Sequence, residues 1–352
     1  MLRVGKSRAA INMMHFQSRL PKLPIPELGP AADQFLKSVK VHEKFDRKDI
    51  EQTERILDSM KSCQGVKDLL VEIRSRDSTN MKDSYITKSL QHRWLSNRKP
   101  QFLQAYTVFS KFDPEIPRNQ FDMAAHVIMK ATKLFLEIKN ETFSPILHQH
   151  KSDPAAPAMF SPEDMTSWKY LFASSRIPQK DVDKNFTDND SKHVTVGVCG
   201  RLYKIQVLNH KDQLIVDLKT LSKVLWKIHR LATENPKPIS PAILTTLPRN
   251  EWADVRNYIQ LTNADFLTTM ESGIFHICLD TKFSEYDNNE TLAEAAAFGS
   301  GLDNWRDKNS KSIVFGNGRI ANNGDHSFTD GRTNMGLTKI LGVYTKHKEY
   351  RV

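Results

Sequence analysis

The chain has 352 residues, 39% of them hydrophobic and 26% charged, a composition that excludes a chain disordered by default. Its length suffices for about two domains with cores of their own. Fourteen glycines and sixteen prolines exclude collagen-like and low-complexity classes, and three cysteines are too few for a secreted disulfide framework. No apolar run approaches the ~20 residues that span a bilayer, so we expect no transmembrane span and at most peripheral membrane contact.

The formal net charge of +10 is concentrated at one end of the chain. Residues 1–26 hold five cations and no acid, so they supply half of the excess. Because half of the basic excess lies in this short terminal segment, and charge is the sole feature that favours nucleic acid, we expect no nucleic-acid partner. Residues 1–19 have the basic, acid-free composition of a mitochondrial targeting segment. An ordinary basic N-terminus, with a peroxisomal or cytoplasmic location, is the alternative.

Residues 20–82 are predicted to form a proline-rich strap followed by helices. Three prolines between Leu20 and Leu28 fix φ and remove backbone donors, which favours an extended segment. Apolar residues then recur at helical spacing over residues 31–73, with a break at Gly65. Residues 74–82 are polar and are predicted to form a loop.

Residues 83–352 are predicted to form an α/β domain. Helical periodicity indicates helices at 85–94, 121–138, 214–230, 251–261 and 336–344, and residues 149–162 are predicted to be loop. Apolar, β-branched runs indicate a hairpin of 193–199 with 202–208 and strands at 241–246, 273–279, 311–315 and 319–323. Alternating strands and helices together with a hairpin favour a mixed sheet flanked by helices.

The segment from His326 to Gly331 carries the most informative motif. A histidine just after a strand, with Asp330 four residues later and then a glycine, suits general base catalysis. Imidazole titrates near pH 6.5 and can take a proton from a hydroxyl or a thiol, while the carboxylate orients the ring or holds the turn. The other reading is a structural histidine.

Other site signatures are weak. His148 and His150 lack a cysteine or carboxylate cluster at zinc spacing, and no phosphate-binding glycine loop or nucleophile-elbow motif occurs. We therefore expect no metal and no tightly bound cofactor.

Five segments together resemble the choline/carnitine O-acyltransferase family. They begin with the strap at residues 20–28 and end with residues 325–331, which are similar to the family's E-H-S-W-x-D-G element around its catalytic histidine. Between them lie Ser174-Ser175-Arg176-Ile177-Pro178, the 243–253 stretch ILTTLPRNEWA, and the 305–310 stretch WRDKNS, in the family's order. The resemblance runs from about Leu20 to the end of the chain.

The resemblance implies a chloramphenicol-acetyltransferase-like fold and acyl transfer between acyl-CoA and carnitine, a reaction of fatty acid metabolism. It makes His326 the general base and Asp330 its orienting or structural carboxylate, with acyl-CoA or CoA as a co-substrate. Trp94 aligns loosely with a family tyrosine beside the carnitine site. Acyl chain length, and carnitine versus choline, stay open.

The resemblance also predicts what is different or lacking here. Asn304 and Arg306 replace a family arginine and phenylalanine, and residues 298–301 depart from a family glycine motif. Only 26 residues follow His326, where the family's second domain supplies CoA contacts and oxyanion donors. We therefore expect a truncated chain, weakly active or inactive alone, with an exposed apolar face that a partner would cover. The alternative is a non-catalytic binding or regulatory relative.

Overall fold

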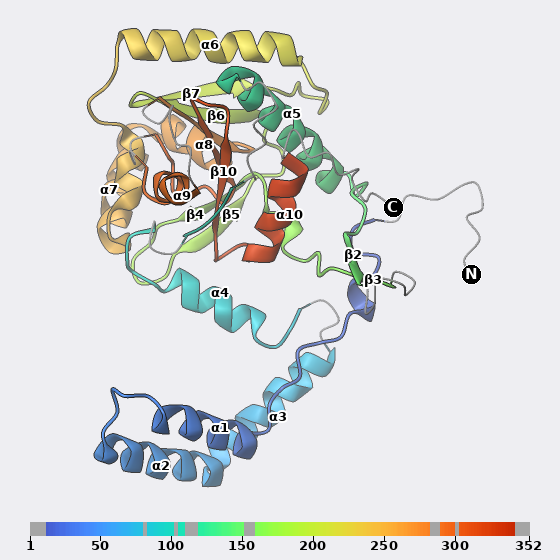
Figure 1. The fold of residues 1–352 in the computed structure, drawn as a ribbon, viewed down its shortest axis with the longest axis vertical. Coiled ribbons are helices and arrows are strands. Elements are labelled where there is room, and N and C mark those ends of the chain that lie inside the picture. The colour runs from blue at the N-terminus through green and yellow to red at the C-terminus, as the bar shows by residue number, and fades with distance from the viewer. Residues whose placement is uncertain are drawn as a thin grey trace, which may run out of the picture. The chain divides into compact units, whose positions relative to one another are not determined.

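The computed structural model describes residues 12–79, 83–101, 105–109, 119–150, 159–281, 289–299 and 303–341. Residues 1–11, which form most of the expected targeting segment, lie outside the described residues. The chain divides into two compact units, one of residues 16–89 and one of residues 1–15 with 90–352 (Figure 1).

The described residues of the 16–89 unit contain three complete α-helices after an extended segment. The 3-10 helix η1 (Gln17–Arg19) precedes the strap, and Leu20 (φ −68°, ψ 141°) has the polyproline-like backbone that the prolines favour. The helices are α1 (Leu28–Lys40), α2 (Arg47–Ser62) and α3 (Gln64–Thr79). Asp46 and Asp49 form a reciprocal capping box that starts α2.

The prediction of a loop from residue 74 was wrong, because α3 continues to Thr79. The polar side chains of this last part bind the strap rather than solvent alone. Arg74 pairs with Glu27 at 2.8 Å, and Lys22 pairs with Asp77 at 3.5 Å. The charged residues that favoured a loop prediction thus form ion pairs between α3 and the extended strap.

Large apolar side chains remain exposed in this unit. Leu23 and Phe35 are 51% and 54% exposed, and α2 has no buried residue. Ile56, Leu69 and Val71 are also exposed. These side chains come from the strap and from α1, α2 and α3, and each is a candidate for contact with a partner.

A six-stranded mixed sheet forms the second unit, in the order β1-β10-β9-β8-β6-β7. Strand β8 runs parallel to β6 and β9, and the other neighbours are antiparallel. The strands are β1 (Ala105–Phe109), β6 (His193–Val198), β7 (Arg201–Gln206), β8 (His276–Asp280), β9 (Lys311–Phe315) and β10 (Ile320–Asp325). Two small antiparallel pairs accompany it, β2 (Leu147–His150) with β3 (Met159–Pro162) and β4 (Ser174–Ile177) with β5 (Lys184–Thr187).

Helices cover both faces of this sheet (Figure 1). On one face α5 (Gln120–Lys139), α6 (Leu218–Glu234) and α10 (Gly331–Leu341) pack in the main core, which includes Val194, Val196 and Ile277. On the other face α9 (Asn289–Ala297) packs against β9 and β10. A separate cluster around Trp252 and Trp305 joins η4 (Pro241–Thr246), α7 (Arg249–Thr262) and α8 (Ala264–Ser272).

The expected α/β class with a mixed sheet flanked by helices is confirmed, with local exceptions. The predicted strand at 241–246 is the 3-10 helix η4, because Pro241 occupies its first turn and the Ser240 hydroxyl accepts a hydrogen bond from the Ala242 N–H. Residues 149–162, predicted as loop, contain parts of β2 and β3. Strands β4 and β5 carry polar and charged residues and were missed.

Candidate functional site

His326 is the first residue of the turn that joins β10 to α10. The turn is held by Asp325, whose carboxylate Oδ1 accepts a hydrogen bond from the Ser327 N–H at 2.6 Å. The Asp325 carbonyl accepts from the N–H groups of Phe328 and Thr329, both at 3.2 Å. Ser327, Phe328 and Thr329 are buried, His326 is half-buried and Asp330 is exposed, so the turn leaves the imidazole partly accessible.

A tryptophan from a distant part of the sequence covers the imidazole. Trp94, on α4 (Thr87–Leu95), stacks on His326 with ring centroids 4.6 Å apart and planes 9° from parallel. The carbonyl of Ser327 accepts hydrogen bonds from Asn185 Nδ2 at 3.0 Å and from Gln91 Nε2 at 3.4 Å. Helix α4 and strand β5 therefore hold the turn from outside the main sheet.

Electrostatics favour a neutral imidazole at this position. Burial lowers the pKa of His326 below its ordinary value, although the nearby carboxylates of Asp325 and Asp330 act in the opposite direction. A neutral ring can accept a proton, and the two carboxylates then stabilise the imidazolium that forms. The site is thus equipped for proton transfer near neutral pH.

The Asp330 side chain caps a helix. Its Oδ1 accepts from the Thr333 N–H at 3.0 Å and from the Thr333 hydroxyl at 3.2 Å, at the start of α10. Asp330 is exposed, and no bond joins it to the imidazole among the hydrogen bonds of the described residues. Asp330 therefore caps the start of α10, and its negative charge acts on His326 through space by raising the pKa of the imidazole.

Three of the sequence segments that carry the resemblance meet in one buried ion-pair network. Asp183 Oδ2 accepts from the Nε atoms of both Arg176 and Arg249, each at 2.7 Å. Asp307 accepts from Arg249 Nη1 and from the Trp252 indole N–H, both at 2.6 Å. All four charged residues are at most 3% exposed, so each depends on its partners for compensation.

Two buried lysines, Lys308 and Lys311, follow Asp307 closely in the sequence. Lys308 Nζ donates to the Glu271 carbonyl at 2.7 Å and to the Ser175 hydroxyl at 3.3 Å, and burial lowers its pKa to about 7. Lys311 Nζ donates to the carbonyls of Arg306 and Lys308, and burial lowers its pKa to about 8. Carbonyl partners hold these side chains without neutralising them, which is why their charged forms are disfavoured.

The positions that differ from the resembled family lie together. Gly299, Asn304 and Arg306 line a cavity of about 20 Å³ beside Cys278, enough for about one water molecule. Arg306 donates to the carbonyls of Ala297 and Phe298 at the end of α9, at 2.8 and 3.2 Å. The arginine that replaces the family's phenylalanine thus ties α9 to the segment leading into β9.

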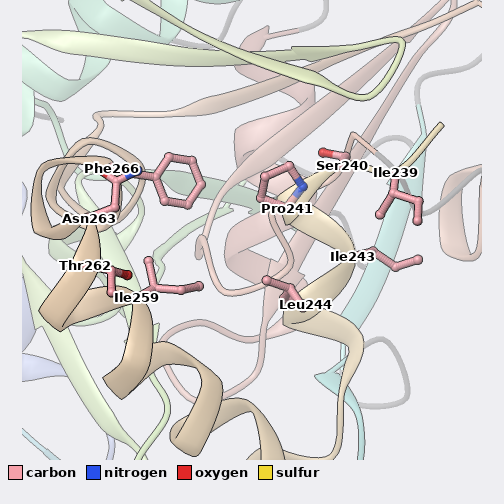
Figure 2. A pocket seen from close by; sticks show the side chains of 9 residues that line it. All are labelled: Ile239, Ser240, Pro241, Ile243, Leu244, Ile259, Thr262, Asn263 and Phe266. Carbon is pink, nitrogen blue, oxygen red and sulfur yellow. The ribbon is translucent and has the colours of Figure 1, made fainter. Parts of the chain in front are cut away.

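A larger pocket lies elsewhere and contains no predicted site residue. It measures about 450 Å³, and Figure 2 shows Phe266, Ile259 and Leu244 among the mostly apolar side chains that line it, between η4 and the helices α7 and α8. In the described parts of the chain, no group of three or more His, Cys, Asp or Glu residues could hold a metal ion. No helix within those parts is long and apolar enough to cross a membrane.

Sequence reasoning identified His326 and Asp330 but assigned no role to Asp325 or Arg176. Arg176 and Asp183 lie in or beside the short polar strands that were missed. The sequence feature that could have indicated them is a charged residue within or beside a segment that also contains strand-compatible residues such as Ser175 and Ile177. A buried charge needs a partner of opposite sign, but the sequence does not say which one.

Comparison with known proteins agrees with the resemblance. The family model described as Choline/Carnitine o-acyltransferase matches residues 23–350. Mitochondrial carnitine O-palmitoyltransferase 2 is 28% identical in Xenopus tropicalis and 27% identical in Homo sapiens, each over 92% of this chain and 52% of the relative. The muscle isoform of carnitine O-palmitoyltransferase 1 from Sus scrofa is 24% identical over 95% of this chain and 43% of its own length.

A chloramphenicol acetyltransferase structure covers 72% of the chain at 11% identity, with a TM-score of 0.30. The chain spans about half the length of the curated carnitine O-palmitoyltransferase 2 relatives that it matches. The family match nevertheless extends over nearly all of its residues and includes His326 with the turn around it. The chain belongs to the choline/carnitine O-acyltransferase family.

Proposed function

We propose that this chain transfers acyl groups between acyl-CoA and carnitine, with His326 as the general base. The observation that supports the proposal is the half-buried imidazole at the end of β10, under the Trp94 ring and with its pKa lowered by burial. The curated relatives are carnitine O-palmitoyltransferases, a name that gives carnitine and a palmitoyl group, and the family resemblance implies acyl-CoA as the donor.

The proposed reaction balances without a metal ion or a redox partner. His326 takes the proton of the carnitine hydroxyl, and the oxygen attacks the thioester carbonyl carbon of acyl-CoA. The tetrahedral intermediate collapses by breaking the carbon–sulfur bond, and the leaving CoA sulfur takes the proton back from the imidazolium. In reverse, His326 takes the proton of the CoA thiol. Asp325 and Asp330 stabilise the imidazolium in both directions.

The family resemblance assigns the oxyanion donors and most CoA contacts to a second domain, so we expect acyl transfer to be fastest where such donors are present, since one contributes roughly 100- to 1000-fold in rate. A partner that covers the exposed Leu23 and Phe35 side chains belongs to the same proposal. A mitochondrial location is proposed from the basic residues 1–19 and from the relatives' names.

The test is release of CoA thiol from acetyl-CoA and palmitoyl-CoA, with carnitine or choline as acceptor. His326→Ala is compared with His210→Ala, which removes an exposed imidazole in the loop after β7. Activity that His326→Ala abolishes and His210→Ala preserves supports the proposal. Activity that survives His326→Ala contradicts His326 as the base.

A binding or regulatory relative is the second candidate, favoured by Arg306 where the family has phenylalanine and by its bonds to the end of α9. Calorimetry with carnitine, CoA and palmitoyl-CoA separates the two functions. Ligand binding that is tight while no thiol is released, with wild-type and His326→Ala chains alike, supports the binding role.

A further inference from the structure

Arg176 lies in the interior behind the Trp94–His326 pair. It is fully buried on β4, and its Nε donates to Asp183 Oδ2 at 2.7 Å. Its Nη2 donates to the Trp94 carbonyl at 2.8 Å and lies 3.4 and 3.3 Å from the carbonyls of Leu95 and Asn97. Trp94 and Leu95 end α4, and Asn97 lies two residues beyond it. The Trp94 carbonyl also accepts from the Asn97 N–H at 3.3 Å, and the Leu95 carbonyl from the Asp183 N–H at 3.0 Å, so Arg176 adds a charged donor to this helix end, where a cation is stabilising.

The same guanidinium also faces the strand that carries His326. Arg176 Nη1 lies 3.7 Å from Asp325 Oδ2, while the other oxygen of that carboxylate holds the Ser327 N–H. Arg176 therefore contacts both supports of the ring pair. One support is the helix end that carries Trp94, and the other is the strand end that precedes His326.

We propose that Arg176 is a positioning residue for His326, whose guanidinium fixes the end of α4 so that the Trp94 indole stacks on the imidazole. The planar guanidinium matters because it reaches several carbonyls, Asp183 and Asp325 in fixed directions, which a lysine ammonium does not reproduce. An effect of Arg176 on acyl transfer rests on the proposed function, whereas its effect on the stacking of Trp94 on His326 does not.

The experiment measures the His326 ring directly, in the full chain labelled with ¹³C-histidine and titrated by NMR. His326→Gln assigns the signal among the twelve histidines. Arg176→Lys keeps the charge beside Asp325 but loses the planar geometry. We expect the pKa of His326 to rise toward 6.5 and the ring-current shift from Trp94 to diminish, because the stacked ring no longer shields the imidazole from water.

Two further variants separate positioning from other effects. Trp94→Leu removes the stack with Arg176 intact and must change the His326 pKa in the same direction. Arg249→Lys disturbs the same Asp183 carboxylate without touching α4 through its side chain, and must leave the His326 signal unchanged. In the double variant Arg176→Lys/Trp94→Leu, the change must equal that of Trp94→Leu alone, since both act through one contact.

An unchanged His326 signal in folded Arg176→Lys overturns the proposal, as does an equal change in Arg249→Lys. Should Arg176→Lys fail to fold, an unchanged pKa in Trp94→Leu overturns it independently. If the wild-type chain transfers acyl groups, Arg176→Lys should lower kcat about 10- to 100-fold and move the acid limb of the pH profile upward. If it transfers none, the proposed function fails while the NMR result still decides the positioning role.

Discussion

Replacing Asp307 with asparagine is expected to destabilise the second unit severely. The carboxylate is 2% exposed and accepts two hydrogen bonds of 2.6 Å, from Arg249 Nη1 and from Trp252 Nε1. In Asp307→Asn only one amide oxygen remains to accept, and the amide N–H₂ faces the other donor. Arg249 is then left to share Asp183 with Arg176.

The magnitude follows from these contacts. Hydrogen bonds to charged groups contribute about 1.5–3 kcal/mol each, and breaking a buried ion pair costs about 3–5 kcal/mol. We therefore expect Asp307→Asn to lower the free energy of unfolding by about 3–5 kcal/mol. The matched control is Asp254→Asn on α7, which breaks an exposed pair with Lys180 at 3.0 Å and should cost less than about 1 kcal/mol.

Urea unfolding followed by tryptophan fluorescence measures both variants, because Trp252 and Trp305 lie beside the network. The double variant Asp307→Leu/Arg249→Met should be less destabilised than Asp307→Asn, since it removes both charges. Equal midpoints for Asp307→Asn and Asp254→Asn would refute the argument that buried charges hold these sequence segments together.

Three other predictions concern the same unit. His276 is fully buried, its ring nitrogens lie 2.8 Å from the Thr195 hydroxyl and the Asp303 carbonyl, and burial lowers its pKa to about 4. Between pH 6.5 and 4 the unfolded chain therefore binds a proton at His276 that the folded chain does not. As the pH falls from 7 to 5, this group should lower the free energy of unfolding by about 2 kcal/mol. The free energy of unfolding is measured against pH for the wild type and for His276→Gln, and an equal slope in the two proteins would contradict this. Asp330→Ala should lower the melting temperature through loss of the α10 cap, about 1 kcal/mol, whereas Asp330→Asn should retain it; equal melting of the two variants would rule out the capping role. Gly197→Ala places a Cβ 2.1 Å from the Asp303 carbonyl oxygen, so we expect little folded protein by circular dichroism, and a native spectrum would show that this backbone can shift.

Periodicity and composition determined much of the secondary structure. Helix α5 follows from apolar residues at helical spacing, and strands β6 and β9, which are buried at every position, follow from short apolar, β-branched runs. Tertiary context decided the exceptions. Strand β4 is polar in sequence because it carries Arg176 and two serines, and it is buried only because Asp183, Lys308 and Glu271 supply partners.

The candidate site divides in the same way. A histidine after a strand, with Asp330 and Gly331 in a turn, is local chemistry that can be read along the chain. The stack of Trp94 on His326 is not, because 231 residues lie between them in the sequence and only the folded unit brings α4 to the end of β10. Nor does the sequence pair Arg176 with Asp325 and Asp183, because the choice among 41 acidic residues depends on which of them the fold buries beside the guanidinium. Burial fixes such pairs, and burial is a property of the tertiary structure.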